Sequence, residues 1–313
     1  MSRRSGRLAR IVLALALAAL VVAAPRTARA TDPVKVKWSD DWRRVQLWEG
    51  LNIIALTVGS SLIAGEWDSQ ATPKWRGGIL FDDAVRSALR GRSLAVQQTA
   101  ADMSDYFYKA GVLVPYFVDV YVVALGIHQS PDVALQMTLM NLQSLGLAGV
   151  VSLGAERAVG RGRPYVGDCG ADGVVRDAAG RPLFNTCGSS GDSESFYSGH
   201  AAATATMAGL TCAHHQHLPL YGGGFADLAP CLTMMGVSAA TGVTRLIADR
   251  HWASDVVIGW SVGTLSGYVL PSILHYGFRS DGPALAVRSG GAVAIPTPQV
   301  YPGGAGVGMV GVF

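Results

Sequence analysis

Seven long, weakly polar segments occupy most of the sequence, and they constrain the fold more than any other feature. Each is long enough for a helix of several turns, and 50% of all residues are hydrophobic whereas only 15% are charged. Such a chain is too apolar to be disordered and too irregular for a collagen or a coiled coil. The sequence therefore predicts an all-α helical bundle. The segments are Leu47–Gly65, Phe81–Tyr108, Val112–Gly126, Pro131–Gly160, Ser198–His214, Pro230–Arg245 and Ala253–Tyr276.

The end of the chain differs in kind. Residues 277–313 are rich in Gly and Pro and carry short apolar runs between them. This pattern is typical of a small β-hairpin or meander appended to a helical body, and equally of a flexible Gly-rich tail. We thus divide the chain into residues 1–30, N-terminal helical segments over 31–109, a core over 110–276, and this tail.

The first thirty residues are typical of a secretory signal peptide. A basic stretch precedes fourteen apolar residues, Ile11 to Ala24, and Ala28-Arg29-Ala30 is a small-x-small cleavage pattern. A membrane-spanning helix needs roughly 20 apolar residues, so we expect cleavage after Ala30 and export to the periplasm or cell envelope. Six of the 25 Lys+Arg are lost with the signal, which leaves 19 basic against 22 acidic residues. This balance excludes a general basic surface for nucleic acid.

Export would place the four cysteines in an oxidising compartment. Four cysteines allow three connectivities, and the one that closes the shortest loops joins Cys169 to Cys187 and Cys212 to Cys231. We expect these disulfides rather than four buried thiols. A zinc site is not expected, because no CxxC spacing occurs.

The polarity of the segments bears on membrane insertion. Asp119, Gln136, Asn141 and Gln143 interrupt apolar stretches. In an integral bundle the loops at one end would be cytoplasmic and rich in Lys and Arg, but residues 214–229 contain neither. These observations favour a mostly water-soluble or membrane-attached bundle over an integral one.

The first of three stretches with reactive side chains is residues 156–164. Arg157, Arg161 and Arg163 end a helix before a proline. The planar guanidinium suits phosphate oxygens, although cations are also common at helix C-termini because they favour the dipole. The Gly-rich loop that follows, 160–196, is long enough to suggest a role in specificity.

The second stretch, Ser198-Gly199-His200, opens an apolar helix. The backbone N–H groups of its first turn point outward with the helix dipole behind them, which makes an anion site, and His200 could donate a proton there. A capping or surface role for the histidine is the alternative.

The third stretch contains Arg245, His251 and Asp255. His251 and Asp255 are four residues apart, so on one helix they share a face and can hydrogen-bond. A carboxylate that accepts from one imidazole nitrogen fixes the tautomer and leaves the other nitrogen free to attack. A solvated His–Asp pair is the alternative interpretation. The His-rich residues 214–217, which we expect at the opposite end of the bundle from these three stretches, are interpreted as a solvated loop rather than a metal site.

Together, and in this order, the three stretches resemble the type 2 phosphatidic acid phosphatase (PAP2) superfamily, which includes acid phosphatases and vanadium haloperoxidases. The family pattern is Lys-x6-Arg-Pro, Pro-Ser-Gly-His and Ser-Arg-x5-His-x3-Asp. Here Arg163-Pro164 ends the first part, 198–200 make the second, and Arg245 to Asp255 complete the third. The resemblance covers Val112–Tyr276 and implies the PAP2/haloperoxidase helical bundle.

The resemblance also implies a metal-independent reaction. His251, oriented by Asp255, attacks phosphorus to form a phosphohistidine, and His200 protonates the leaving oxygen and then activates water. The implied substrate is a phosphomonoester or pyrophosphate on a small molecule or a lipid. The phosphate-binding candidates are Arg163, Ser198, Gly199, Arg245, Arg157 and Arg161.

This sequence departs from the family pattern at three positions. Tyr197 replaces a proline, Thr244 replaces a serine, and Glu156 stands where the family has its lysine. An acid there would repel phosphate, so either Arg157 or Arg161 substitutes for the lysine or activity is reduced.

Two other functions stay open. In a vanadium haloperoxidase the equivalent of His251 would ligate vanadate, which would be the only cofactor. Alternatively, the chain is a non-catalytic envelope protein that retains the fold and binds anions, an interpretation motivated by Glu156 and the C-terminal tail.

Overall fold

A computed structural model describes residues 35–68, 72–170, 174–176, 180, 182–184, 187–277, 287–289, 292–301 and 304–312. The chain divides into two compact units, 1–35 and 36–313, and every described helix and strand belongs to the second. The predicted signal peptide, residues 1–30, lies outside the described residues.

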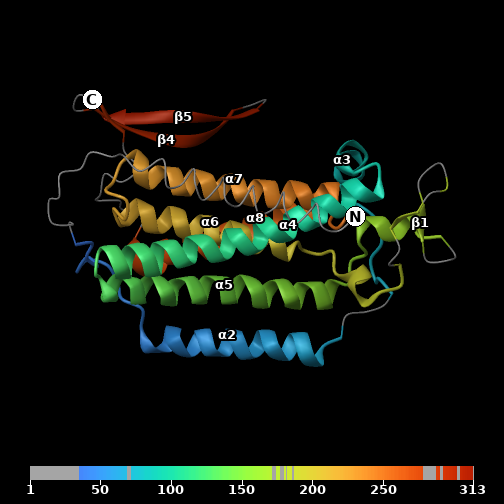
Figure 1. Cartoon of the computed structure of the whole chain (residues 1–313), viewed down its shortest axis with the longest axis horizontal. Coiled ribbons are helices and arrows are strands. Elements are labelled where there is room, and N and C mark those ends of the chain that lie inside the picture. Colours follow the sequence, from blue (N-terminus) through green and yellow to red (C-terminus); the bar gives the residue numbers. More distant parts are fainter. Residues whose placement is uncertain are drawn as a thin grey trace, which may run out of the picture. The chain divides into compact units, whose positions relative to one another are not determined.

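Long helices dominate the second unit, so the prediction of an all-α bundle is confirmed (Figure 1). A π-helix, Tyr116–Ile127, continues α4, and two π-helical turns, Leu265–Val269 and Ser272–Tyr276, continue α8. The helices are α2 (Leu47–Glu66), α3 (Asp82–Leu89), α4 (Leu94–Pro115), α5 (Pro131–Val159), α6 (Gly199–His217), α7 (Phe225–Ile247) and α8 (Ala253–Thr264).

The helix ends have local causes. Helix α5 begins with Pro131 in its first turn, where a proline loses no hydrogen bond, and it ends at Gly160 with φ +58°. Helix α7 begins earlier than its predicted start at Pro230. The side chain of Asp227 accepts hydrogen bonds from the N–H groups of Tyr221 and Gly223 and so holds the preceding turn against the helix.

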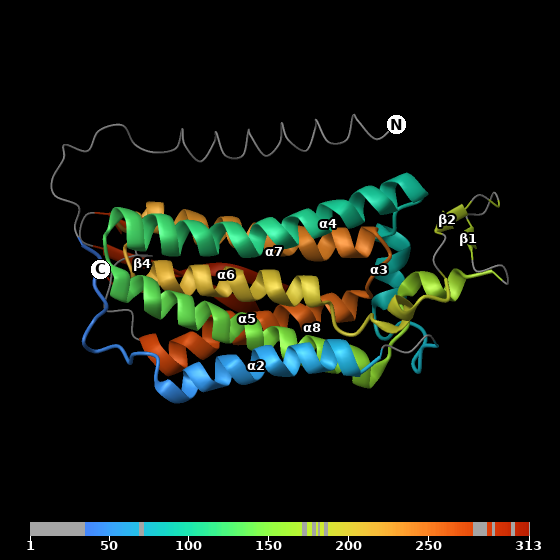
Figure 2. The ribbon, with the colours of Figure 1, turned by 60° about the horizontal axis from the view of Figure 1, so that its bottom comes forward.

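Helix α6 lies at the centre of the bundle, among α4, α5, α7 and α8 (Figure 2). Helix α8 approaches it closely through Gly259, Gly263 and Gly267, which share one face because they are four residues apart. A Cβ at each of these glycines would collide with the backbone of α6. The glycines face, in order, the carbonyl oxygens of Ser198, Ala202 and Thr206.

This order of contacts makes α6 and α8 parallel. The N-terminal ends of the two helices therefore lie at the same end of the bundle, which brings the second and third sequence stretches together. Along the chain, α7 connects α6 to α8 and runs in the opposite direction to both. The disulfide Cys212–Cys231 joins α7 to α6. Both predicted disulfides are present, since Cys169–Cys187 closes the loop before α6.

That loop contains two short 3-10 helices, Pro164–Asp168 and Ser190–Ser193, and a pair of short antiparallel strands, β1 (Val175–Arg176) and β2 (Pro182–Phe184).

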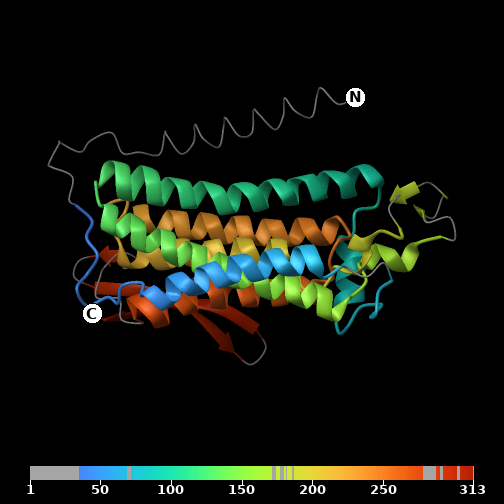
Figure 3. The same ribbon diagram turned by 90° about the horizontal axis from the view of Figure 1, so that it is seen from below.

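The outward faces of several helices are apolar. On α2, which lies along α5 (Figure 3), Leu51, Ile54 and Leu62 are more than half exposed. Four helical stretches among the described residues are long and apolar enough to cross a membrane, which fits membrane association. These stretches are Leu47–Glu66, Leu94–Ile127, Pro131–Val159 and Ala253–Tyr276.

The polar residues that argued for a water-soluble bundle do not face outward. Asp119, Gln136, Asn141 and Gln143 are all at most 5% exposed, inside the bundle. Their positions therefore give no reason against membrane association, and the preference for a mostly soluble protein loses this support.

The described parts of the tail form an antiparallel three-stranded sheet in the order β3 (Val287–Ser289), β4 (Ala292–Tyr301) and β5 (Gly304–Val312). Strand β4 pairs with β5 from Val293↔Val312 to Tyr301↔Gly304. Of the two alternatives for the tail, the structure has the β-meander.

Candidate active site

His251 lies in the turn before α8 and is only 4% exposed. Its Nδ1 lies 2.7 Å from the carbonyl oxygen of Ser195. A carbonyl only accepts, so Nδ1 carries the proton and donates it, and Nε2 keeps its lone pair. The Nη2 atom of Arg245 lies 3.1 Å from that Nε2. Burial, with Arg245 and Arg163 nearby, holds the pKa of His251 well below its ordinary value. The histidine is therefore a neutral imidazole, and its Nε2 lone pair accepts a hydrogen bond from Arg245.

Asp255 does not bond His251 directly, which corrects the expected i,i+4 pair. Helix α8 begins at Ala253, so His251 precedes the helix and the two side chains do not share a helical face. Asp255 instead accepts from Ser195 Oγ at 2.6 Å, and the backbone carbonyl of the same serine accepts from His251. Asp255 thus orients His251 through Ser195.

Arg161 is fully buried and lies within an ionic cluster. Its guanidinium donates to Asp255 at 2.6 Å and to Asp82, in the first turn of α3, at 2.7 Å. It also lies 4.1 Å from the ring centroid of Trp75. Because two carboxylates and an aromatic face already bind its guanidinium, Arg161 holds the structure together, and its predicted contact with phosphate gains no support.

The Ser198–His200 turn forms the start of α6 as predicted. Ser198 is its N-cap, and its side chain accepts from the N–H of Ala201. A Cβ at Gly199 would lie 3.0 Å from Ser152 Oγ of α5, so a larger residue there would require the Ser152 side chain to shift. The first-turn N–H groups of Gly199 and His200 point along the helix axis and make an anion site.

His200 contacts a residue that sequence reasoning did not select. Its Nε2 donates to Asp105 Oδ1 of α4 at 2.9 Å, and Tyr108 of the same helix lies 4.6 Å from its ring. Burial, followed by the charge of Arg245, lowers the pKa of His200 to about 4, although Asp105 acts in the opposite direction.

The arginines of the first stretch divide in role. Arg163 and Arg245 both act electrostatically on His251 and His200, so they surround the same space. Arg157 forms an ion pair with Glu194, and Arg163 lies 3.9 Å from that carboxylate. Arg163 and Arg245 therefore remain candidates for phosphate binding.

Glu156 lies in the last turn of α5 beside this site. A Cβ at Gly199 would be 3.7 Å from Glu156 Oε1. Burial, followed by the charge of Glu194, raises the pKa of Glu156 to about 7, against the charges of Arg163, Arg157 and Arg245. Arg157 pairs with Glu194, and Arg161 pairs with Asp82 and Asp255.

A second cluster braces the turn that carries His251. Asp249 has φ +57° and is 1% exposed, and its carboxylate accepts from Arg86 of α3 and pairs with Arg90. Both arginines also pair with Asp168 of the disulfide loop. Helix α3 thus ties the loop before α6 to the loop before α8.

The residues that sequence reasoning missed share one property: each acts from a distant part of the chain. Asp82 and Asp105 are isolated acids in N-terminal helices, and Asp105 meets His200 from 95 residues away. The only available signal was an acid on an otherwise weakly polar segment.

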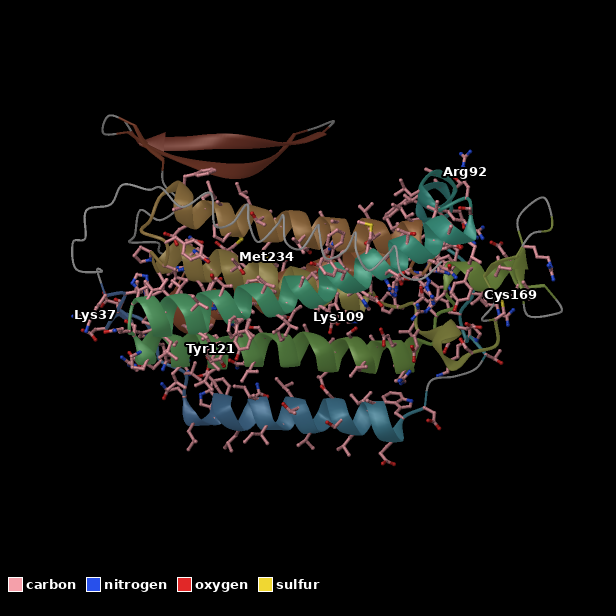
Figure 4. The ribbon with its side chains drawn as sticks, viewed as in Figure 1. Lys37, Arg92, Lys109, Tyr121, Cys169 and Met234 are labelled. Carbon is pink, nitrogen blue, oxygen red and sulfur yellow. A yellow bond between two sulfur atoms is a disulfide. The ribbon has the colours of Figure 1, made fainter. Side chains whose placement is uncertain are left out.

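The histidine-rich residues 214–217 are not the solvated loop that the sequence suggested, because His214 and His215 are buried in the last turns of α6. Within the described ranges, no group of three or more His, Cys, Asp or Glu side chains could hold a metal ion. Figure 4 shows that Tyr121, near the far end of the bundle, and Cys169, near the site, are widely separated.

Two sequence comparisons with known proteins bear on the family of this chain. The family model of the PAP2 superfamily matches residues 139–279, so the predicted resemblance is confirmed. A lipid A 1-phosphatase of Porphyromonas gingivalis is 36% identical over 75 residues, which are 23% of this chain and 15% of that relative. The match thus spans a small part of the relative's length. No solved structure matches the chain.

Proposed function

Because residues 139–279 match the PAP2 superfamily, we propose that this chain hydrolyses a phosphoric ester through a phosphohistidine at His251. The observation that carries the proposal is the tautomer of His251. Its Nδ1–H is bonded to the Ser195 carbonyl, so Nε2 carries the lone pair. In the free protein this lone pair accepts a hydrogen bond from Arg245, and a phosphate group that binds Arg245 would release it for attack.

In the first step, Nε2 of His251 attacks phosphorus, the N–P bond forms and the P–O bond to the leaving group breaks. The leaving oxygen takes a proton from His200. In the second step, His200 accepts a proton from water, the water oxygen attacks phosphorus and the N–P bond breaks. The products are the alcohol and inorganic phosphate. The phosphate takes the proton back from His200 and leaves as the monoanion, so both histidines return to their neutral starting state.

Charge on the phosphoryl oxygens must be stabilised throughout the transfer. Arg163 and Arg245 supply fixed cations, and the first-turn N–H groups of Gly199 and His200 supply backbone donors. The low pKa of His200 leaves it neutral in the free enzyme, so the proton enters with the substrate. A phosphate monoanion is then the form that binds productively, and we expect activity to fall as the pH rises above the second ionisation of the phosphate ester.

A lipid-linked phosphate fits the surface of the bundle. The four apolar helical stretches have exposed apolar side chains that suit contact with lipid, and one relative is named a lipid A 1-phosphatase. We infer that the enzyme works at a membrane of the cell envelope. The two disulfides support export, because disulfides persist in oxidising compartments.

The test is to replace His251 by Ala or Gln and to assay purified protein on lipid phosphates, isoprenoid pyrophosphates and small soluble esters. We expect kcat to fall at least about 1,000-fold, as for loss of a nucleophile. His128→Gln is the matched control, because His128 bonds the carbonyl of Leu220 at the other end of the bundle. In wild-type protein, acid-labile label from a radioactive phosphate ester would report the intermediate.

Undiminished turnover in the His251 variants would contradict the proposal. Halide oxidation that depends on added vanadate would favour the haloperoxidase instead. Phosphate binding with no hydrolysis of any substrate in the panel would favour the non-catalytic alternative.

A further inference from the structure

Asp105 lies on α4, in the N-terminal part of the chain that the family match does not cover. Its side chain is half exposed, at 50%, whereas that of His200 is 28% exposed. One carboxylate oxygen, Oδ1, lies 2.9 Å from Nε2 of His200 and 3.6 Å from Nη1 of Arg245. The same oxygen therefore faces both the proton donor and a phosphate-binding arginine.

We propose that Asp105 is a positioning residue of the phosphatase, which holds the His200 ring by accepting its Nε2–H and keeps it beside Arg245. This inference rests on the proposed function for its catalytic meaning. With Nε2–H donated to Asp105, Nδ1 is the ring nitrogen that exchanges a proton with the leaving group and later with water. Asp105 itself contacts neither the phosphate nor the reacting atoms.

The charge around His200 explains why such a partner is needed. Burial most of all, and then the charges of Arg245 and Arg163, disfavour the imidazolium that must form when His200 accepts a proton. Asp105 is the group whose hydrogen bond and charge both favour the imidazolium. The titratable and charged groups that face His200 are Asp105 and Tyr108 from α4, Arg245 from α7, Arg163 and Glu156 from α5 and the segment after it, and His251 from the turn before α8.

Loss of the Asp105 carboxylate should lower the pKa of His200, a shift that a merely structural role would not produce. Without Asp105 the imidazolium of His200 is less stable, so the histidine loses its proton at a lower pH. The titration midpoint of His200 should therefore move to lower pH, and kcat at pH 7 should fall more than KM changes. The alkaline fall of kcat/KM should stay in place, because the ionisation of the phosphate ester sets it.

The experiment compares Asp105→Asn, Asp105→Ala and Asp105→Glu with Asp102→Asn as the matched control. Asp102 is an exposed acid on the same helix, one turn earlier. We expect Asp105→Asn and Asp105→Ala to lower kcat about 10- to 100-fold, the range of general acid–base catalysis, and Asp105→Glu to recover part of the loss. Asp102→Asn should match the wild type in kcat and in its pH profile.

A second readout does not need turnover. In protein with isotope-labelled histidine, the NMR signal of His200 is assigned by its absence in His200→Gln, and its titration midpoint is then followed against pH. The midpoint should fall in Asp105→Asn and stay unchanged in Asp102→Asn. An unchanged His200 midpoint and an unchanged kcat in all Asp105 variants would overturn the proposal. If the wild type hydrolyses nothing, the proposed function fails, and the NMR midpoint alone decides whether Asp105 holds His200.

Discussion

The pKa values of two histidines on α6 are shifted in opposite directions, although each histidine contacts an aspartate. His200 in the first turn bonds Asp105, and burial and Arg245 lower its pKa to about 4. His215 near the other end lies fifteen residues later, about 22 Å along the helix, and its pKa is raised to about 9.

The surroundings account for the difference. Burial opposes the charged form of His215 too, but two carboxylates overcome it: Asp227 lies 2.6 Å from Nδ1 and Asp119 lies 3.4 Å from Nε2. At His200 one half-exposed carboxylate competes with two arginines. A histidine that must exchange protons is thus kept neutral, whereas a histidine that is charged holds two buried acids together. One end of α6 is built for chemistry and the other for stability.

The largest expected effect is at the far end. His215→Gln should lower the free energy of unfolding by about 3–5 kcal/mol, because it leaves two buried carboxylates without their cation. Because the pKa of His215 is raised on folding, its contribution is fully present below the ordinary histidine pKa and is lost as the pH rises through about 9. Denaturant unfolding at pH 6 and pH 10 measures both values.

The control for this variant is His217→Gln, since His217 bonds the carbonyl of Ala213 and stacks on Tyr276. It should cost about 1 kcal/mol, with little dependence on pH above 7. If the two variants lose the same stability at both pH values, a protonated His215 does not hold Asp119 and Asp227 together.

The two disulfides also differ in their expected effects on stability and activity, and these effects are smaller than that of His215. They close loops of similar length, with sequence separations of 18 and 19, so the chain-entropy model gives each about 3 kcal/mol. Replacing Cys212 and Cys231 by Ala should lower stability and leave kcat of the folded enzyme unchanged. Replacing Cys169 and Cys187 should lower kcat as well, because Asp168 next to Cys169 anchors the arginines that brace Asp249.

Melting curves and kinetics of the two double variants test whether only the loss of Cys169–Cys187 lowers kcat. Equal effects on kcat would show that the bracing of the His251 turn does not depend on the disulfide loop.

The smallest expected effect concerns Glu156. Burial, followed by the charge of Glu194, raises the pKa of Glu156 to about 7, so its negative charge is fully present only above that pH. At pH 8, Glu156→Gln removes this charge, and phosphate should bind better. A half-buried charge at this distance is worth about 1 kcal/mol, which corresponds to a rise in kcat/KM of about fivefold. Steady-state kinetics test it, with Glu66→Gln at the exposed end of α2 as the control. A fall in kcat/KM would mean that Glu156 assists the reaction.

Much of the fold and part of the site could be predicted from local sequence. Helix α5 was predicted from Pro131 to Gly160 because its start and stop signals lie within the helix ends themselves. The pairing of Cys169 with Cys187 followed from the shortest loops, and the Ser198–His200 turn followed from its own cap residue. The structure agrees in each case because these features depend on residues close in sequence.

Contacts between distant segments were predicted poorly. Local spacing suggested that Asp255 would bond His251, but the side chain of Asp255 turns to Arg161, 94 residues away. The residue type of Arg161 and its place in the first stretch suggested a phosphate ligand. Only its burial against Asp82 and Trp75 gives it another role.

The sequence by itself determined that this chain forms apolar helices, that its cysteines pair locally, and that its arginines and histidines follow the order of a phosphate site. Only the tertiary structure decided which of those charges reach the site. The close packing of α8 on α6 brings His251 to His200, and helices α3 and α4 then supply Asp82 and Asp105. A charge acts through its distance and its burial, and neither is fixed until helices from distant parts of the chain have packed together.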